Sequence, residues 1–503
     1  MSKAGLRALE IQQTSELSQR RWRLLVIASI GVFLATLDSS ILSVALPVIS
    51  SDLQLTFSEA LWVQASYLIV VTILLIPIGR WGERHGLFFA YWLGNLLFGA
   101  FSVAVALSWN GTFMIGARVF QAIGGALIIT TSAAIVAAAF PSSERGRALG
   151  LNMMGSTLGQ TVGPPLGGLI VAHMNWPWIF YIKVPVAALT VLAGWDLLGA
   201  ERRDRAAARL AAATTADSAG HVADRSRIDI RGAGLLGMVL AALFVPLIFS
   251  PLWGWDSWRT IGPLVSAVVL AVVFVFIEGR TRDPILDLGL FKRSRVFAAA
   301  NTASLLFMAS SYGVTIFTAV FLEVVQGRSA QSTGLILLIQ PAVMTIITPL
   351  AGRLSDHLGS RGLSAAGMLV MAAGTGQLAL LSLSAPVSQV VGALGTLGLG
   401  LAIFSTPNFS AIMGSVDRSK LGVASGLFTA SRFCGMGVSI AILGAIAASS
   451  LGPEGGRVIL LGTRASLGNA EAFATGYREA MLVGTGIAVI GALVSLVRER
   501  QPA

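Results

Sequence analysis

The residue best suited to chemistry in this 503-residue chain is Asp38, an acid within a long apolar run. It lies 14 residues from the start of that run at residue 24, which is ~21 Å at helical rise. A charged carboxylate is costly in hydrocarbon, so such residues usually carry protons or act as counter-ions for a substrate. The alternative is a structural aspartate that caps or pairs. The depth of Asp38 favours a role in proton coupling.

Three cations also lie within apolar runs, namely Arg118, Lys183 and Arg432. Arg118 lies ~8–9 Å from the end of its run and Asp38 lies ~12 Å from the corresponding end, so the two are expected to pair. Protonation of Asp38 would then release Arg118, although Arg118 could instead bind helix-end carbonyls. Lys183 is expected either to line a cavity or to extend its ammonium group to the membrane surface.

Candidate cavity residues are Tyr67, Gln121, Lys183 and Arg432, with helix packing as the alternative role of Arg432. The three cations outnumber the one deep acid. This excess argues against a cavity that accepts only cationic compounds.

The elements that position these residues follow from the composition. Hydrophobic residues make up 55% of the chain and charged residues only 12%, about half of the ~25% that is typical of soluble proteins. A single cysteine, Cys434, excludes an intrachain disulfide. Fourteen apolar runs are long enough to span the ~30 Å core of a bilayer. They cover 24–46, 60–79, 87–107, 113–138, 147–172, 177–199, 232–252, 260–278, 297–322, 332–352, 363–384, 388–413, 422–449 and 476–497.

The basic residues support this number and orient the spans. With both ends in the cytoplasm, 27 of the 35 Lys and Arg residues fall on the cytoplasmic side, five fall outside and three lie within spans. This is the bias that the positive-inside rule describes, and one helix more or fewer would invert half of it. The net charge of +11 therefore indicates membrane topology rather than nucleic-acid binding. No cleavable signal peptide is expected.

An internal repeat divides the chain into two halves. Gly79, Glu83 and Gly86 recur as Gly352, Asp356 and Gly359 in the pattern G-R-x-x-acid-x-x-G, 273 residues later. Repeated halves with a substrate site between them are typical of secondary transporters. The expected regions are a cytoplasmic N-terminus (1–23), a six-helix bundle (24–199), a cytoplasmic linker (200–231), two inserted helices (232–278), a cytoplasmic connection (279–296), a second six-helix bundle (297–497) and a cytoplasmic tail (498–503).

Five segments resemble the major facilitator superfamily, and specifically its fourteen-helix drug:proton antiporters. Residues 37–47 resemble the helix 1 signature, with Ser43 where Asn is usual. Residues 79–86 resemble the loop 2–3 motif, with Glu83 for the usual Asp and Leu87-Phe88 in place of two basic residues. Residues 118–126 resemble the helix 4 motif, and residues 283–293 the entry into helix 9. Helix 5 matches the antiporter motif in full at Gly150, Gly159, Gly163, Pro164, Gly167 and Gly168.

Each motif has a physical interpretation. Glycines at 155, 159, 163 and 167 form one face of helix 5, along which another helix can approach closely. The functional interpretation is a sealed contact with the other half of the protein, and the alternative is ordinary small-residue packing. Gly79, Glu83, Arg84 and Gly86, with Gly352 and Asp356 in the second half, are expected to form a cytoplasmic gating motif.

The resemblance implies an all-α polytopic membrane protein with the major facilitator fold, built from two six-helix bundles and two inserted helices. It implies a proton-coupled exporter of amphipathic small molecules in the cytoplasmic membrane of a bacterium, driven by the proton gradient. We expect no cofactor, no metal, no nucleic acid and a monomer. Alternatives are export of a specific endogenous metabolite or lipid, proton symport for uptake, or a membrane sensor or enzyme. The intact helix 5 motif disfavours uptake, and the chain has no P-loop or H-E-x-x-H motif and no large extramembrane domain.

Overall fold

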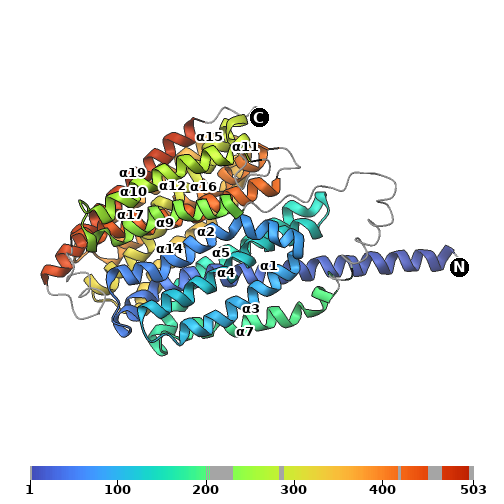
Figure 1. The fold of residues 1–503 in the computed structure, drawn as a ribbon, viewed down its shortest axis with the longest axis horizontal. Helices are drawn as coiled ribbons and strands as arrows, with labels where there is room; N and C mark the ends of the chain where they lie inside the picture. Colours follow the sequence, from blue (N-terminus) through green and yellow to red (C-terminus); the bar gives the residue numbers. More distant parts are fainter. Residues whose placement is uncertain are drawn as a thin grey trace.

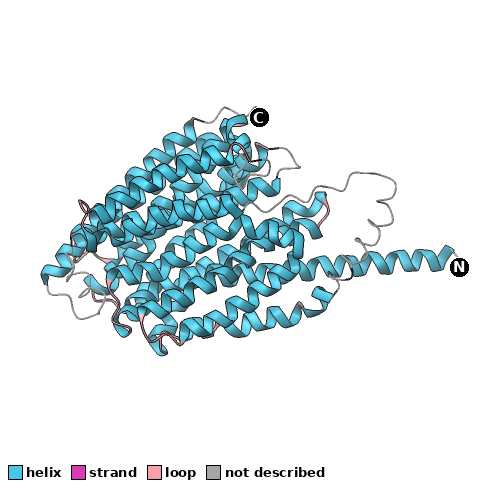
Figure 2. Ribbon diagram, in the orientation of Figure 1, coloured by secondary structure: helices cyan, strands magenta, loops and turns pink. Residues whose placement is uncertain are grey.

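The computed structural model describes residues 3–199, 201, 203, 230–281, 288–416, 421–450 and 467–497. Throughout these residues the secondary structure is helical, with no strand (Figure 2). The predicted linker at 200–231 and the tail at 498–503 lie almost entirely outside them. The predicted connection at 279–296 is described only in part, and it contains the short helix α11 (Leu288–Arg293).

Helices from the first half of the chain form one bundle, drawn in blue to cyan in Figure 1. They are α1 (Lys3–Asp52), α2 (Phe57–His85), α3 (Leu87–Ala106), α4 (Gly111–Ala139), α5 (Ser142–His173), α6 (Trp178–Tyr181) and α7 (Lys183–Ala193). Helix α1 already begins at Lys3 within the expected N-terminal region 1–23 and extends beyond the bundle (Figure 1). The cytoplasmic location of this region stays a prediction.

Helices from the second half form the other bundle, drawn in yellow to red in Figure 1. They are α12 (Arg295–Val320) with the π-helix η1 (Phe321–Val325), α13 (Ala330–Leu337), α14 (Ile339–Leu358), α15 (Ser360–Ala379), α16 (Val387–Gly414), α17 (Leu421–Ser449) and α19 (Leu467–Leu496). The start of α1 and the end of α19 lie at the same end of the molecule (Figure 1). We call this the terminal end, and the opposite one the far end.

The internal repeat is visible in the backbone. Gly86 follows α2 and Gly359 follows α14, and both have a positive φ, at 124° and 78°. The next pair, Gly94 and Gly367, lies 273 residues apart at two close helix crossings. A Cβ atom added to either glycine would lie 3.0 Å from a carbonyl oxygen on the following helix, α4 or α16. The two halves therefore repeat both a turn and the packing that follows it.

The two inserted helices lie beside the halves. Helix α9 (Ile230–Trp253) packs against α2 of the first half and α17 of the second, and α10 (Trp258–Glu278) packs against α9. One face of α10 carries strongly exposed valines, with Val268 66% and Val272 65% exposed. Such a face suits contact with lipid.

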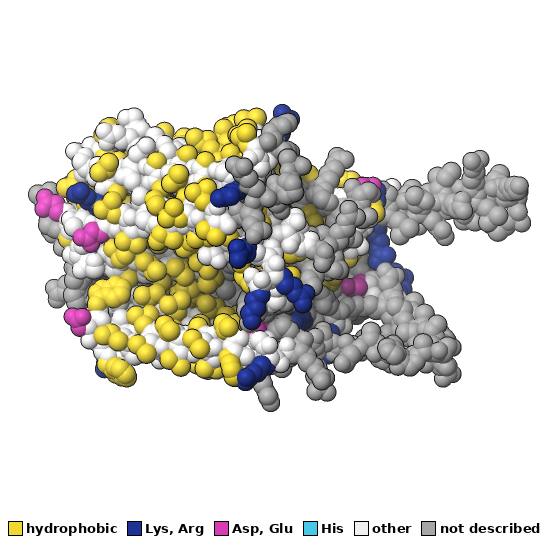
Figure 3. All heavy atoms as spheres, turned by 90° about the horizontal axis from the view of Figure 1, so that it is seen from above, with side chains coloured by type: hydrophobic (Ala, Val, Ile, Leu, Met, Phe, Trp, Pro, Cys, Tyr) yellow, Lys and Arg dark blue, Asp and Glu magenta, His cyan; other side chains and the backbone are white. Residues whose placement is uncertain are grey.

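Eleven of the described helices are long and apolar enough to cross a membrane, and two apolar helices are shorter, at Trp178–Ala193 and Gly234–Ser250. The 32-residue α5 is long enough, but its many glycines and polar residues leave it outside this set. The number of fourteen spans therefore remains a prediction. Figure 3 shows hydrophobic side chains across the body of the molecule, with Lys and Arg gathered mainly towards the terminal end.

Candidate functional site

The candidate site is a buried cluster of polar side chains around Asp38. The carboxylate lies in the middle of α1 and is fully buried. It accepts hydrogen bonds from three side chains, those of Arg118 and Gln121 on α4 and of Lys183 on α7. The structure thus brings together four residues that sequence analysis selected from three separate runs.

Arg118 is held in place from several directions. Its Nη1 donates to Asp38 Oδ2 at 2.5 Å and to Gln121 Oε1 at 2.8 Å, and its Nε donates to the Val63 carbonyl at 3.1 Å. The guanidinium carbon lies 4.6 Å from the centre of the Tyr67 ring. Arg118 therefore pairs with Asp38, and the backbone carbonyl that it also binds lies within α2 rather than at a helix end.

Lys183 forms the second ion pair with Asp38, through Oδ1. It is fully buried, so its ammonium group does not extend to a membrane surface. It is the first residue of α7, directly after α6, and its Nζ lies 4.2 Å from the centre of the Phe180 ring. Of the two expectations for Lys183, the inward position is the one observed.

Gln121 completes the ring of contacts. Its Nε2 donates to Asp38 Oδ1 at 3.1 Å and to Ser102 Oγ on α3 at 2.8 Å. Arg118 and Gln121 are three residues apart on α4, so they share one face of the helix. Five elements, α1, α2, α3, α4 and α7, therefore contribute to the cluster around this carboxylate.

The cluster carries one negative and two positive charges, and two of its hydrogen-bond donors have no acceptor among the described residues. Arg118 Nη2 and the Tyr67 hydroxyl are buried without a hydrogen-bond partner in the described part of the chain. Unpaired buried donors are costly, so they are suited to an additional acceptor such as a substrate oxygen. Gly125 allows this arrangement, because a Cβ atom there would lie 2.9 Å from the Tyr67 ring.

A further hydrogen bond connects the cluster with the second half of the protein. Gln64 Nε2 on α2 donates to the Tyr312 hydroxyl on α12 at 2.6 Å and to the Ser39 carbonyl, next to Asp38, at 3.1 Å. Sequence analysis did not select Gln64, Tyr312 or Ser102. The available signal was weak: Tyr312 is one of only five tyrosines in the chain and lies within an apolar run.

The glycine stripe of α5 faces α1, which corrects the expectation that it contacts the other half. A Cβ atom at Gly159 would lie 2.5 Å from the Phe33 carbonyl oxygen, and one at Gly163 would lie 2.8 Å from the Ile41 backbone nitrogen. Ser40 on α1 also donates to the Gly159 carbonyl at 2.9 Å. The physical reason is that α1 and α5 belong to the same bundle. Their backbones can stay in close contact while the two halves of the protein move relative to each other.

Contact with the other half is made by neighbouring residues nearer the far end of α5. A Cβ atom at Gly168 would lie 2.5 Å from the Ala330 carbonyl oxygen, and one at Gly334 of α13 would lie 2.5 Å from the Pro164 carbonyl oxygen. Gly167 belongs to the α1 side, at 2.8 Å from the Ile41 carbonyl, whereas Gly150 has open space around it. Helix α5 is therefore packed between the helix of Asp38 and the second half.

The predicted gating motif lies at the terminal end. Gly79 and Arg84 are in the last turns of α2, and Gly86 forms the turn into α3, with its backbone N–H donating to the Gly82 carbonyl at 2.7 Å. Gly352 lies in α14, and the side chains of Glu83 and Asp356 lie outside the described residues. Two basic residues are expected at positions 87 and 88, where this chain has Leu and Phe. The backbone N–H groups of Phe88 and of the next residue, Phe89, donate to the Glu201 carboxylate, at 3.1 and 2.9 Å.

Arg432 does not join the cluster around Asp38. It lies on α17, half-buried, with its guanidinium carbon 5.6 Å from the centre of the Phe428 ring. This contact agrees with the packing alternative. The described residues contain no group of three or more His, Cys, Asp or Glu side chains that could hold a metal ion.

Comparisons with known proteins agree with this architecture. The family model described as Major Facilitator Superfamily matches residues 28–440. Riboflavin transporter RibZ of Clostridioides difficile is 29% identical over 434 residues, covering 86% of this chain and 90% of RibZ. Multidrug resistance protein Stp of Mycobacterium tuberculosis is 31% identical over 428 residues, covering 85% of this chain and 76% of Stp.

Among solved structures, a bacterial homologue of the human lysosomal transporter Spinster, in an inward-facing and unoccupied conformation, has a similar fold. Its TM-score is 0.65 at 17% identity, covering 95% of this chain and 96% of that one. At this identity the likeness concerns the fold alone.

Proposed function

Because the chain belongs to the Major Facilitator Superfamily and is a multi-pass membrane transporter rather than an enzyme, we propose that it exports amphipathic small molecules in exchange for protons. The proposed direction is out of a bacterial cell across its cytoplasmic membrane. Drugs, antibiotics and related metabolites are the proposed substrates. The name of the relative Stp supports multidrug export, and the full helix 5 motif supports exchange with protons.

The observation that carries the proposal is the fully buried carboxylate of Asp38 between two cations. Protonation of Asp38 would leave Arg118 and Lys183 as two buried positive charges without a counter-ion. Protonation therefore removes the ion pairs that hold α1 to α4 and α7, and the two like charges, one on α4 and one on α7, repel each other. A single proton could in this way change the contacts of three helices.

The proposed path from the proton to the alternating halves runs through α1. Helix α5 packs on α1 along its glycine stripe and touches α13 of the second half at Gly168. Gln64 adds a hydrogen-bonded connection from α1 to Tyr312. Movement of α1 would therefore change these two contacts between the halves. A ligand or proton that favours one arrangement shifts the equilibrium towards it.

We propose that both termini are cytoplasmic, as the distribution of basic residues indicates. The far end is then extracellular. Contacts between the halves are found there: Gly444 of α17 lies against Leu61 of α2, and Gly168 lies against Ala330. In this arrangement they close the extracellular side. We also propose that the protein acts as a monomer.

The charge of the cluster bears on the substrate. Its net charge of +1 and its unpaired donors on Arg118 and Tyr67 favour neutral compounds that carry acceptor oxygens. A specific endogenous metabolite would meet the same criteria, and the similarity to a riboflavin transporter keeps this second candidate open. The helix 5 motif is the observation that disfavours uptake.

Transport by purified protein in vesicles with an imposed pH gradient tests the proposal. The substrates for this assay are the hits of an efflux screen of cationic, neutral and anionic compounds in a pump-deficient host. The wild-type protein should accumulate such a substrate only when the pH gradient is present. Asp38→Asn should bind neutral substrate without accumulating it. If this variant transports like wild type, the proton carrier lies elsewhere. The next candidate would be Glu323 in η1, whose Oε1 is buried without a described partner.

A further inference from the structure

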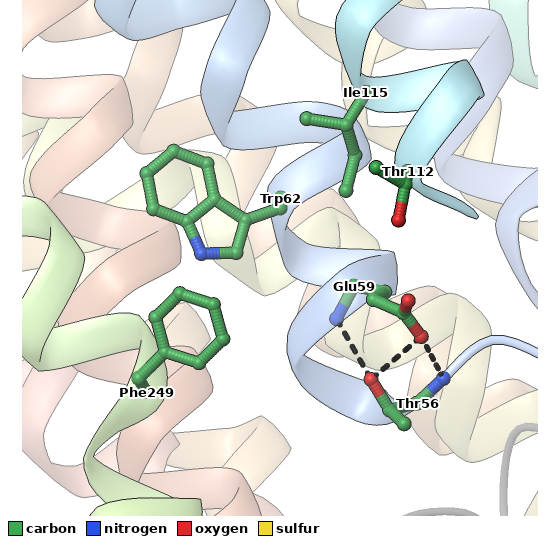
Figure 4. Close-up of a pocket in the computed structure, with 6 residues that line it drawn as sticks. All are labelled: Thr56, Glu59, Trp62, Thr112, Ile115 and Phe249. Atoms are coloured by element: carbon green, nitrogen blue, oxygen red, sulfur yellow. Dashed lines mark hydrogen bonds between the residues drawn. The ribbon is translucent and has the colours of Figure 1, made fainter.

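A cavity of about 410 Å³ lies near the far end, apart from the Asp38 cluster (Figure 4). Its lining comes from α2, from α4 and from the inserted helix α9. The lining residues are Thr56, Glu59, Trp62, Thr112, Ile115 and Phe249. The volume is within the range of cavities that hold drug-sized molecules.

Two aromatic rings form one wall of the cavity. The ring centres of Trp62 and Phe249 lie 6.0 Å apart, with an interplanar angle of 36°. Trp253 also stacks on Phe249, with the two ring centres 5.0 Å apart. The indole Nε1 of Trp62 is buried and has no hydrogen-bond partner in the described part of the chain. The wall is therefore aromatic and carries one buried donor without a partner in the described part of the chain.

The carboxylate of Glu59 is the one charged group in this lining. Its Oε2 accepts hydrogen bonds from the backbone N–H and the hydroxyl of Thr56, at 2.8 and 2.9 Å, in a capping box at the start of α2. Among the described residues no donor is assigned to its Oε1. Gly111 at the start of α4 provides the space, since a Cβ atom there would lie 3.2 Å from that oxygen.

The inserted helix is needed to complete the cavity. Phe249 comes from α9, and the preceding residue, Ile248, has its carbonyl oxygen 3.4 Å from the Ser58 hydroxyl of α2. Arg118 lies one helical turn from Ile115 towards the membrane centre, but it is fully buried and paired with Asp38. The charge of Arg118 is therefore compensated in the Asp38 cluster and does not line this cavity.

We propose that this cavity is a binding site for an amphipathic organic cation, separate from the Asp38 cluster. Positive charge is attracted by the faces of Trp and Phe rings and by a carboxylate with an unused oxygen, and both lie on this lining. The Asp38 cluster has the opposite preference, because its net charge is positive. The site also gives the inserted helix α9 a function beyond packing. The inference goes beyond the proposed function and needs no transport to test.

The test is equilibrium binding of radiolabelled tetraphenylphosphonium to the full-length protein in nanodiscs of phosphatidylglycerol. Glu59→Gln is the sharpest variant, because glutamine at this position still forms a capping box while the charge is lost. We expect about tenfold weaker binding in Glu59→Gln, and roughly three- to tenfold weaker binding in Trp62→Leu and in Phe249→Leu. The neutral analogue triphenylphosphine oxide should bind weakly and equally to wild type and Glu59→Gln.

Glu471→Gln is the matched control, because it removes an exposed acid from α19, near the same end, and should bind like wild type. Asp38→Asn should also keep its tetraphenylphosphonium affinity, which separates this site from the proposed coupling site. Unchanged binding in Glu59→Gln would overturn the proposal. So would equal losses of the cation and of the neutral analogue. Nanodiscs with added phosphatidylethanolamine should give the same affinity, and competition by this lipid would assign the cavity to a lipid amine instead.

Discussion

Replacing Asp38 with asparagine removes the one negative charge from a cluster that holds two buried cations. The side chain keeps its size, so the change isolates charge from packing. Removal of one partner from a buried ion pair typically costs about 3–5 kcal/mol, because the remaining charge has no compensation. Here two cations lose their counter-ion at once, since Arg118 and Lys183 both bind Asp38. We therefore expect Asp38→Asn to lose at least about 3 kcal/mol of stability.

The chain contains a convenient reporter for this loss. Cys434 is its single cysteine and is half-buried on α17, so a thiol-reactive dye reports unfolding during heating. A loss of this size should lower the unfolding midpoint by roughly 3 °C or more. Glu471→Gln, an exposed acid changed in the same way, should leave the midpoint unchanged.

A double variant makes the reasoning sharper. Asp38→Asn combined with Lys183→Met removes one charge of each sign, so the net charge of the cluster stays at +1. It should recover about 2 kcal/mol relative to the sum of the two single changes. Transport driven by the pH gradient should stay absent. Equal midpoints for wild type and Asp38→Asn, or strictly additive losses in the double variant, would refute the view that both cations depend on this carboxylate.

Three more predictions concern the contacts around the cluster. Gly159→Leu should abolish exchange in vesicles while the protein still inserts into the membrane, because the leucine side chain would separate α5 from α1. The control Gly150→Ala should be tolerated, because Gly150 has open space around it. Full exchange by Gly159→Leu would contradict the close contact. Tyr312→Phe should weaken the connection between the halves by about 0.5–1.5 kcal/mol and change the accessibility of engineered cysteines at the two ends, with an unchanged ratio counting against that connection. Glu83→Gln should reduce the population that is open at the far end, and Asp356→Asn should do so less; equal accessibility to wild type would argue against a gating motif.

The fold was largely predictable because the membrane constrains it so strongly. Apolar runs and the spacing of basic residues predict helices and their direction, and the 273-residue repeat predicts two related bundles. The turn at Gly86 and its counterpart at Gly359 show the repeat in the backbone. The helical start of the chain was not predicted, because α1 continues without interruption from polar residues into the apolar run.

The contacts within the site could be predicted only for residues whose depth in the membrane follows from their position in an apolar run. Equal depth was enough to expect Asp38 beside Arg118, since both lie on regular helices. Lys183 could not be placed in this way, because its position near the end of a run is compatible both with an extended side chain at a membrane surface and with the buried position observed. The periodicity of glycines in α5 identified a contact face but not its partner, which turned out to be α1. The bond between Gln64 and Tyr312 depends on how the halves meet, which no local pattern records.

The charges around Asp38 also determine how export and uptake can be told apart. In the paired cluster, the unused donors of Arg118 and Tyr67 are fixed by their contacts with Asp38 and its neighbours, so a substrate that binds them favours the unprotonated form. Coupling between two ligands is reciprocal, and a substrate that favours the unprotonated form must displace a proton when it binds. At a pH low enough for Asp38 to be partly protonated, purified wild-type protein should therefore release protons when substrate is added to a weakly buffered solution, and Asp38→Asn should not. Proton uptake on substrate addition would show that proton and substrate bind together, which is the requirement for symport. The sign of this one measurement thus decides between exchange and uptake without knowledge of which side the substrate enters from.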